Sequence, residues 1–190
     1  MVWWDHETQS LWSQPTGTAI EGPLAGVRLD GIPAAVQRWG AWLTEHPDTS
    51  LLMDTDGILD GSLRPRDPFA TASEEVAGIT VASASKAWRI VDVQEIVALN
   101  DALGDIPLLV YANKDDGAVH IYVRESESES LEFAWRDGEL RDLATDSLWN
   151  GGLGIAVEGP LRGTTLRLVP HSSAFDWAWE LHNPRTELWP

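Results

Sequence analysis

Cysteine is absent from the chain of 190 residues. This absence excludes disulfide bonds, zinc sites with thiolate ligands, iron–sulfur clusters and cysteine nucleophiles together. No apolar run approaches the 18 or more residues that a membrane-spanning helix needs, so we expect no membrane span. The sequence also lacks the basic and apolar opening segments that are typical of a signal peptide.

Basic residues are scarce: 13 Lys and Arg stand against 30 Asp and Glu, which gives a formal net charge of −17. A protein that binds nucleic acid needs a basic face, and these basic residues are scattered singly, so we expect no nucleic-acid partner. Only Lys86 and Lys114 are Lys. An acidic surface that is poor in Lys suggests a halophilic protein, and an ordinary acidic protein is an equally good interpretation.

The charge imbalance predicts that salt stabilises the folded chain. Repulsion among carboxylates is screened as the Debye length falls from ~10 Å at 0.1 M salt to ~3 Å at 1 M. We expect the melting temperature at pH 7 to rise between these two NaCl concentrations, as measured by circular dichroism. Near the sequence pI of 4.4 the net charge vanishes, and the same salt increase should have little effect. A melting temperature that stays flat or falls at pH 7 would contradict the halophilic interpretation.

One segment of sequence occurs twice, as SLWSQPTGTAIEGPLAG at 10–26 and as SLWNGGLGIAVEGPLRG at 147–163. Positions 5–51 align with 142–188 without a gap, and 19 of the 47 aligned positions are identical. Identity of this extent indicates an internal duplication, and two copies are too few for a solenoid. We therefore predict a pseudo-twofold pair of repeated units.

Each copy carries the same series of expected elements. Short polar side chains at Asp5, Thr8 and Ser10 are expected to close a turn on the backbone. Two short strands follow, and apolar residues at helical spacing then predict helices over 33–46 and 170–182. Ser172 or Ser173 is the expected N-cap of the second helix, and a further strand is expected from Thr49 to Met53.

The middle of the chain is expected to be a polar loop at 54–75 followed by strands. DTDGILD at 54–60 lacks the ligands of a calcium loop and is interpreted as a solvated turn. Alternating apolar residues predict strands within 76–83, 86–93, 106–113, 118–126 and 130–138, with hairpin turns at 115–117 and 136–138 and a short helix that begins at Asp92.

These patterns predict an α+β fold that is mostly antiparallel β with two short helices. The first unit spans 1–53, the connecting loop 54–75 and the second unit 76–190, and we expect the two units to pack as one body. The first unit is incomplete, because Met1 aligns with Gly138 and counterparts of strands 106–135 would precede it. Either the sequence is truncated, or the strands of the second unit serve both halves. Because the first unit lacks its upstream strands, a sheet edge beside Trp3 and Trp4 is expected to be open, and an open edge would permit self-association.

The longest motifs resemble a known family. DHETQSLWSQPTGTAIEGPLAG, WLTEHPDTSLLM, LRPRDPF, EEVAGITV and FDWAWELHNPRTELW are similar to the signature of the domain-of-unknown-function family 3179 across essentially the whole chain. The resemblance implies no known reaction. It implies a longer N-terminal part with a cysteine-containing strand and frequent export or lipid anchoring, so an extracytoplasmic location is expected.

The candidate catalytic residues are the acids that recur in both copies: Asp5, Glu21, Asp142 and Glu158. Paired carboxylates are typical of hydrolases. A simpler explanation for an acid that occurs in both copies is a structural role in a turn or hairpin. Ser10 and Ser147 lack the surroundings of a nucleophile. Five His residues show no metal-ligand spacing, so we expect no metal and no cofactor.

Eleven Trp residues accompany only three Phe and two Tyr. Trp serves either as bulky core or as a platform on which sugars stack. The recurring pairs Trp12/Trp149 and Trp42/Trp179 are expected in the core. Four unpaired residues are the candidates for ligand binding: Trp3, Trp4, Trp88 and Trp135.

Three functions stay open on this evidence. The first is a non-catalytic binding or structural module with a Trp-lined groove between the two units, whose ligand is a small molecule or glycan. The second is a hydrolase-like enzyme that uses Glu21 or Glu158. The third is an inactive fragment of a longer protein.

Overall fold

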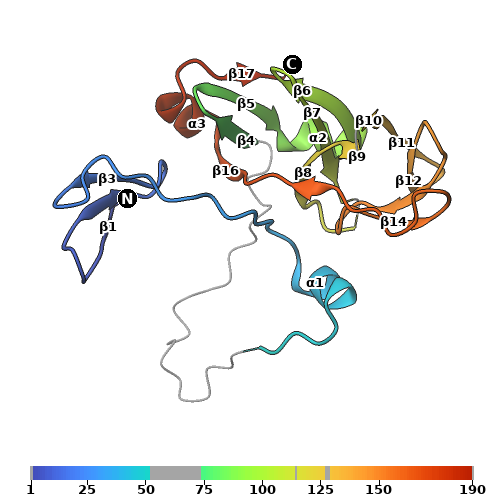
Figure 1. Cartoon of the computed structure of the whole chain (residues 1–190), viewed down its shortest axis with the longest axis horizontal. Helices are drawn as coiled ribbons and strands as arrows, with labels where there is room; N and C mark the ends of the chain where they lie inside the picture. The colour runs from blue at the N-terminus through green and yellow to red at the C-terminus, as the bar shows by residue number, and fades with distance from the viewer. Residues whose placement is uncertain (1, 52–73, 114, 127–128, 190) are drawn as a thin grey trace.

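The computed structural model describes residues 2–51, 74–113, 115–126 and 129–189 (Figure 1). The expected loop at 54–75 lies almost wholly outside these residues, as do the turn at 54–60 and positions 52–53 of the expected strand. The described chain is mostly antiparallel sheet with three short helices, which confirms the α+β class.

The middle layer of the second unit is a four-stranded sheet in the order β15-β8-β7-β6. Its central strand β7 is buried on both faces, because successive side chains of a strand point to opposite sides. Leu108 and Val110 pack on one side and Leu109 and Tyr111 on the other. The strands are β6 (Ala98–Leu103), β7 (Ile106–Ala112), β8 (Val119–Val123) and β15 (Arg167–Leu168).

A second sheet, in the order β16-β4-β5-β17, covers one face of the middle layer. Trp88 and Ile79 lie in the core between these two sheets, together with Val93 of α2. The elements are β4 (Glu75–Val81), β5 (Ala84–Arg89), α2 (Ile90–Ile96), β16 (Ser172–Phe175) and β17 (Glu187–Leu188). Helix α3 (Asp176–His182) covers the outer face of this sheet, where Trp179 packs with Val76 and Ala87.

A third sheet, in the order β11-β12-β13-β14, covers the opposite face of the middle layer. Its core residues include Phe133, Leu140 and Trp149, which pack against Tyr122. The strands are β11 (Phe133–Arg136), β12 (Glu139–Asp142), β13 (Leu148–Asn150) and β14 (Ile155–Glu158), and a two-stranded ribbon of β9 (Glu125–Ser126) and β10 (Glu129–Ser130) precedes them.

The first unit contributes a three-stranded sheet that lies apart from these layers, and a helix (Figure 1). The elements are β1 (Val2–Trp4), β2 (Leu11–Ser13), β3 (Thr18–Glu21) and α1 (Trp39–Glu45). Strand β1 aligns with β12, but it pairs only with β2 among the described strands, whereas β12 pairs with both β11 and β13. Trp3 and Trp4 therefore lie on an edge strand. Self-association through this edge stays a prediction.

The two copies of the repeated segment have closely matching local backbones. Gly22 and Gly159 have φ angles of 96° and 90°, and Gly17 and Gly154 have 61° and 63°. A Cβ on Gly22 or on Gly159 would lie 2.7 Å from the Cα of a Ser in its own unit, so both bends require Gly. The pseudo-twofold arrangement of two whole units stays a prediction.

The helices predicted over 33–46 and 170–182 were too long, and the short helix expected to begin at Asp92 is present as α2, which begins at Ile90. Helix α1 begins at Trp39 rather than Pro33, and α3 begins at Asp176 rather than Pro170. Residues 172–175 form β16 instead, because their backbone pairs with β4, so neither Ser172 nor Ser173 is the N-cap. Helix α2 is the third helix.

The expected turn at 136–138 is confirmed. Strands β11 and β12 are joined by Asp137 and Gly138, whose φ angles are 52° and 84°. Positive φ at both central residues is the geometry that a two-residue hairpin requires.

Candidate functional site

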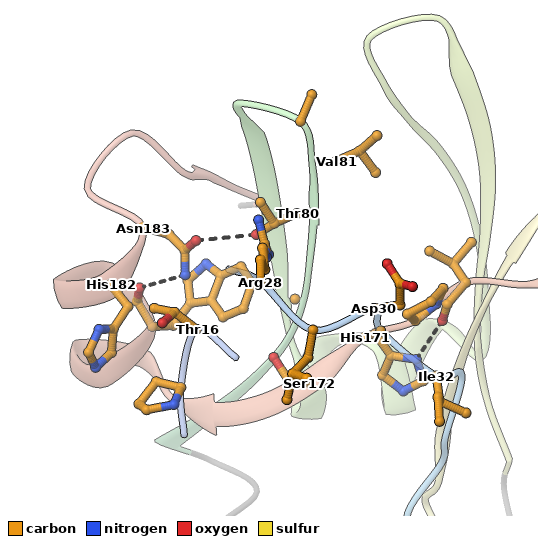
Figure 2. Close-up of a pocket in the computed structure, with 18 of the residues that line it drawn as sticks. Thr16, Arg28, Asp30, Ile32, Thr80, Val81, His171, Ser172, His182 and Asn183 are labelled. Carbon is orange, nitrogen blue, oxygen red and sulfur yellow. Dashed lines mark hydrogen bonds between the residues drawn. The ribbon is translucent and has the colours of Figure 1, made fainter. Parts of the chain in front are cut away.

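A groove of about 580 Å³ lies between the first unit and the sheet that α3 covers. Residues Arg28 to Ile32 form one wall, and β4, β16 and α3 form the other. Figure 2 shows side chains from both walls gathered around one space, including Arg28, Asp30, Thr80 and His171. Because the two walls come from segments far apart in the sequence, the groove exists only when both units are in place.

The wall formed by α3 is fixed by close packing. Trp179 is only 5% exposed and lies directly over Gly78, where a Cβ would come within 2.5 Å of the indole ring. The Trp179 indole N–H donates to Thr186 Oγ1 at 2.8 Å. Asn183 ends the helix and accepts a hydrogen bond from Thr80 Oγ1 at 3.2 Å, as Figure 2 shows. These bonds hold the wall rigid.

The groove is basic in an acidic chain. Arg28 and Arg167 line it and are exposed, and neither makes an ion pair with the described residues. Among the described residues, Asp30 is the only carboxylate that lines the groove. An unpaired guanidinium offers planar N–H donors that match a carboxylate, so the groove is suited to an anion.

Two His rings lie at this groove: the half-buried His171 lines it, and the buried His120 lies next to His171. Burial lowers the pKa of His171, whose Nδ1 lies 3.1 Å from the Val169 carbonyl. Burial, and then the neighbouring His171, lower the pKa of His120 to about 4. Both rings are therefore neutral at pH 7, and the positive charge of the groove comes from the two Arg.

The carboxylates of Asp5 and Asp142 accept hydrogen bonds from turn residues within their own units. Asp142 accepts hydrogen bonds from the Thr145 backbone N–H at 2.6 Å and from the Trp149 indole at 3.1 Å. Asp5 accepts the matching bonds from Thr8 at 2.6 Å and Trp12 at 2.8 Å. The bonds from Trp12 and Thr8 lower the pKa of Asp5 to about 2.

Glu21 and Glu158 are exposed on two different hairpins, at the ends of β3 and β14. Neither lines the groove of Figure 2. No observation therefore favours a paired-carboxylate site. Among the described residues, no group of three or more acids and His is arranged to hold a metal ion.

The Trp candidates lie in three different settings. Trp88 is fully buried and its indole donates to Asp101 at 2.7 Å, so it is a core residue and its place among the ligand-binding candidates is corrected. Trp3 and Trp4 are about half exposed and line a small hollow beside His6. Trp135 is half-buried in a separate cavity.

The repeated Trp residues also differ from one another. Trp12, Trp149 and Trp179 are buried, as expected. Trp42 is 37% exposed, so its expected place in the core was wrong. Its indole donates to Thr49 Oγ1 at 2.8 Å, the bond equivalent to that of Trp179, but Trp42 belongs to none of the hydrophobic clusters of the described residues.

Sequence reasoning missed every charged residue of the groove. A signal for them exists in the repeat: Arg28 aligns with Thr165, and Arg167 aligns with Asp30. The two copies thus differ at both Arg positions. Unpaired Arg at such positions in an acidic chain therefore mark a candidate site.

Comparison with family models identifies one relationship. The model of the family described as protein of unknown function DUF3179 matches residues 1–186. The chain belongs to this family. The match to DUF3179 covers both walls of the groove, including Arg28 and Asn183. No curated protein and no solved structure matches the chain. Among the described residues, no helix is long and apolar enough to cross a membrane.

Proposed function

We propose that this DUF3179 member is a non-catalytic binding module whose groove takes a small molecule with a carboxylate. The observation that carries the proposal is that Arg28 and Arg167, which have no ion-pair partner among the described residues, line one groove of a chain with a net charge of −17. The long-range field of such a chain repels anions. Positive groups at one place, with no carboxylate partner among the described residues, therefore favour a specific anionic ligand.

The remaining lining suits a ligand with both apolar and hydroxyl groups. Ile32, Val81 and Pro170 supply apolar surface, and Thr16 and Ser172 supply hydroxyls that donate and accept. A volume of about 580 Å³ lies within the range of small-molecule sites. An acidic sugar combines these features, so a uronic acid is the appropriate probe.

Galacturonate should bind the groove, and the neutral sugar galactose should bind at least ~10-fold more weakly, because only the carboxylate can pair with the guanidinium groups. Isothermal titration calorimetry on the full chain measures both. Arg28→Gln and Arg167→Gln should each weaken galacturonate binding by about 10-fold. Arg162→Gln removes the same charge from an exposed position outside the groove and should leave the affinity unchanged.

Two outcomes would contradict this function. Equal affinity for the two sugars would show that the charge of the ligand is not recognised. Equal losses in all three Arg variants would show that only the total charge of the chain matters.

We further infer an internal duplication and an extracytoplasmic role. The duplication is supported by the aligned identities and by the matching bonds of Asp5 and Asp142. The location is supported by the resemblance to a family whose members are frequently exported.

A further inference from the structure

A second cavity, of about 650 Å³, lies where the loop after β7 and the β11–β14 sheet meet α1. Its walls carry the rings of Tyr111 and Trp135 and the carboxylates of Asp115, Asp116 and Glu45. It shares no lining residue with the groove of Figure 2. It is therefore a separate candidate site with the opposite charge.

One buried polar atom in its lining has no partner among the described residues. Asp116 is 5% exposed; its Oδ1 accepts a hydrogen bond from the Ala118 backbone N–H at 2.9 Å, and its Oδ2 accepts none. Beside it, the ring of Tyr111 lies against Gly151, and the Tyr111 hydroxyl makes no hydrogen bond with a described residue. Buried polar groups in folded proteins are normally paired, so Asp116 Oδ2 points to a hydrogen-bond donor from outside the chain, and the Tyr111 hydroxyl offers a second acceptor beside it.

The charge of the lining is strongly negative. Glu139 is paired with Arg141 at 2.8 Å, but Asp115, Asp116 and Glu45 have no ion pair among the described residues. Of the basic side chains in the part of the chain that the structure describes, Arg38 alone lines the cavity. Burial, with these three carboxylates nearby, raises the pKa of Tyr111 to about 12. The hydroxyl is therefore neutral at pH 7, and its oxygen remains an acceptor.

The aromatic rings favour an organic cation. The ring centroids of Tyr111 and Trp135 lie 6.3 Å apart with an interplanar angle of 51°, so the two rings form a corner. The faces of Trp and Tyr rings attract ammonium groups. The described acids are not arranged in a group that could hold a metal ion. A ligand with N–H donors satisfies the oxygens, and its carbon atoms contact the rings.

We propose that this cavity binds a small organic molecule through a primary ammonium group, which donates to Asp116 Oδ2 and to the Tyr111 hydroxyl oxygen. The test uses isothermal titration calorimetry on the full chain at one fixed salt concentration. The probes are putrescine, its neutral isostere 1,4-butanediol, tetramethylammonium, which has no N–H, and magnesium chloride. Putrescine should bind saturably at one site, and each other probe should bind at least ~10-fold more weakly.

Variants locate the site. Asp116→Asn keeps the acceptor for Ala118 and removes the charge, and it should weaken putrescine binding by about 10-fold. Asp105→Asn removes the same charge from an exposed turn between β6 and β7, and it should have no effect. Tyr111→Phe keeps the ring, and it should weaken binding several-fold. Because Tyr111→Phe leaves the acids in place, it tests whether putrescine binds in this cavity even if Asp116→Asn fails to fold.

Three results would overturn the proposal. Equal effects of Asp116→Asn and Asp105→Asn would show attraction to the net charge alone. Tetramethylammonium that binds as tightly as putrescine would exclude a role for N–H donors. Magnesium that competes at equal concentration would assign the cavity to inorganic cations. Each result is independent of the galacturonate experiment, because the two cavities have no residue in common.

Discussion

Replacing Trp149 with Ala should lower the free energy of unfolding by about 3–5 kcal/mol, as truncation of a buried aromatic residue does. Trp149 is 3% exposed and packs edge-on against Phe133, with ring centroids 5.3 Å apart. Its indole also donates to Asp142. The variant loses the packing of the core between the middle sheet and the third sheet, and chemical denaturation measures the loss.

Trp12 provides the matched control. It makes the equivalent indole bond to Asp5 and is 7% exposed, but it belongs to none of the hydrophobic clusters of the described chain. Trp12→Ala should therefore cost less than Trp149→Ala. Equal and small losses for the two variants would show that neither indole is part of a core.

Replacing Asp142 with Ala should be nearly as damaging, with a loss of about 3–5 kcal/mol, because several donors lose one acceptor together. The Ser147 backbone N–H and the Trp149 indole both donate to Asp142 Oδ2, at 3.1 Å each, and Thr145 donates to Oδ1. The donors from Ser147 and Trp149 are buried, so each would stay unpaired in the variant. Denaturation of Asp142→Ala beside wild type measures this loss.

The ionisation of Asp142 gives this prediction a pH dependence. Desolvation by burial raises its pKa, but the bonds from Trp149, Thr145 and Ser147 together outweigh this and lower it. The stabilisation is therefore present above the unfolded-state pKa of about 3.9 and is lost as the pH falls through the lower folded-state pKa. Asp142→Asn should lose less stability than wild type over this acidic range. An identical pH dependence in the two proteins would show that the Asp142 carboxylate is not the group that is titrated.

The core strands were predictable and the polar strand was not. The run IPLLVYA is apolar at successive positions because both faces of β7 are buried, and this pattern is typical of an internal strand. Strand β6 reads ALNDAL and gave no strand signal. Its Asn100 exchanges two hydrogen bonds with the Phe133 backbone, and its Asp101 pairs with Lys86 at 2.8 Å. Such tertiary bonds fix a strand without an apolar pattern.

The helices were overextended for a related reason. Apolar spacing indicates which residues share a face, but it does not show where the backbone pairs with a neighbouring strand instead of forming a helix. Ser172 to Phe175 pair with β4, and the helix begins only after this pairing ends. Periodicity within one segment carries no information about β4, which lies about 100 positions earlier in the sequence.

The candidate site was predictable only as a location between the two units. The Trp excess suggested a groove, but Trp88 is core, and Arg28 and Arg167 supply the groove's charge instead. Their importance depends on the absence of ion-pair partners among the described residues, and a partner is a property of the folded chain. Identity between the copies pointed to Asp5 and Asp142 as candidates, but their carboxylates already accept hydrogen bonds within the turns.

The most direct test of the central claim, that the groove between the two units binds an anion, is an NMR titration of the ¹⁵N-labelled chain with galacturonate. We predict saturable shifts of the Trp179 indole N–H, the Arg28 and Arg167 guanidinium N–H groups and the Asn183 amide. Galactose at the same concentration should leave these resonances in place. Shifts confined to Trp3 and Trp4, or the same shifts with galactose, would contradict the account.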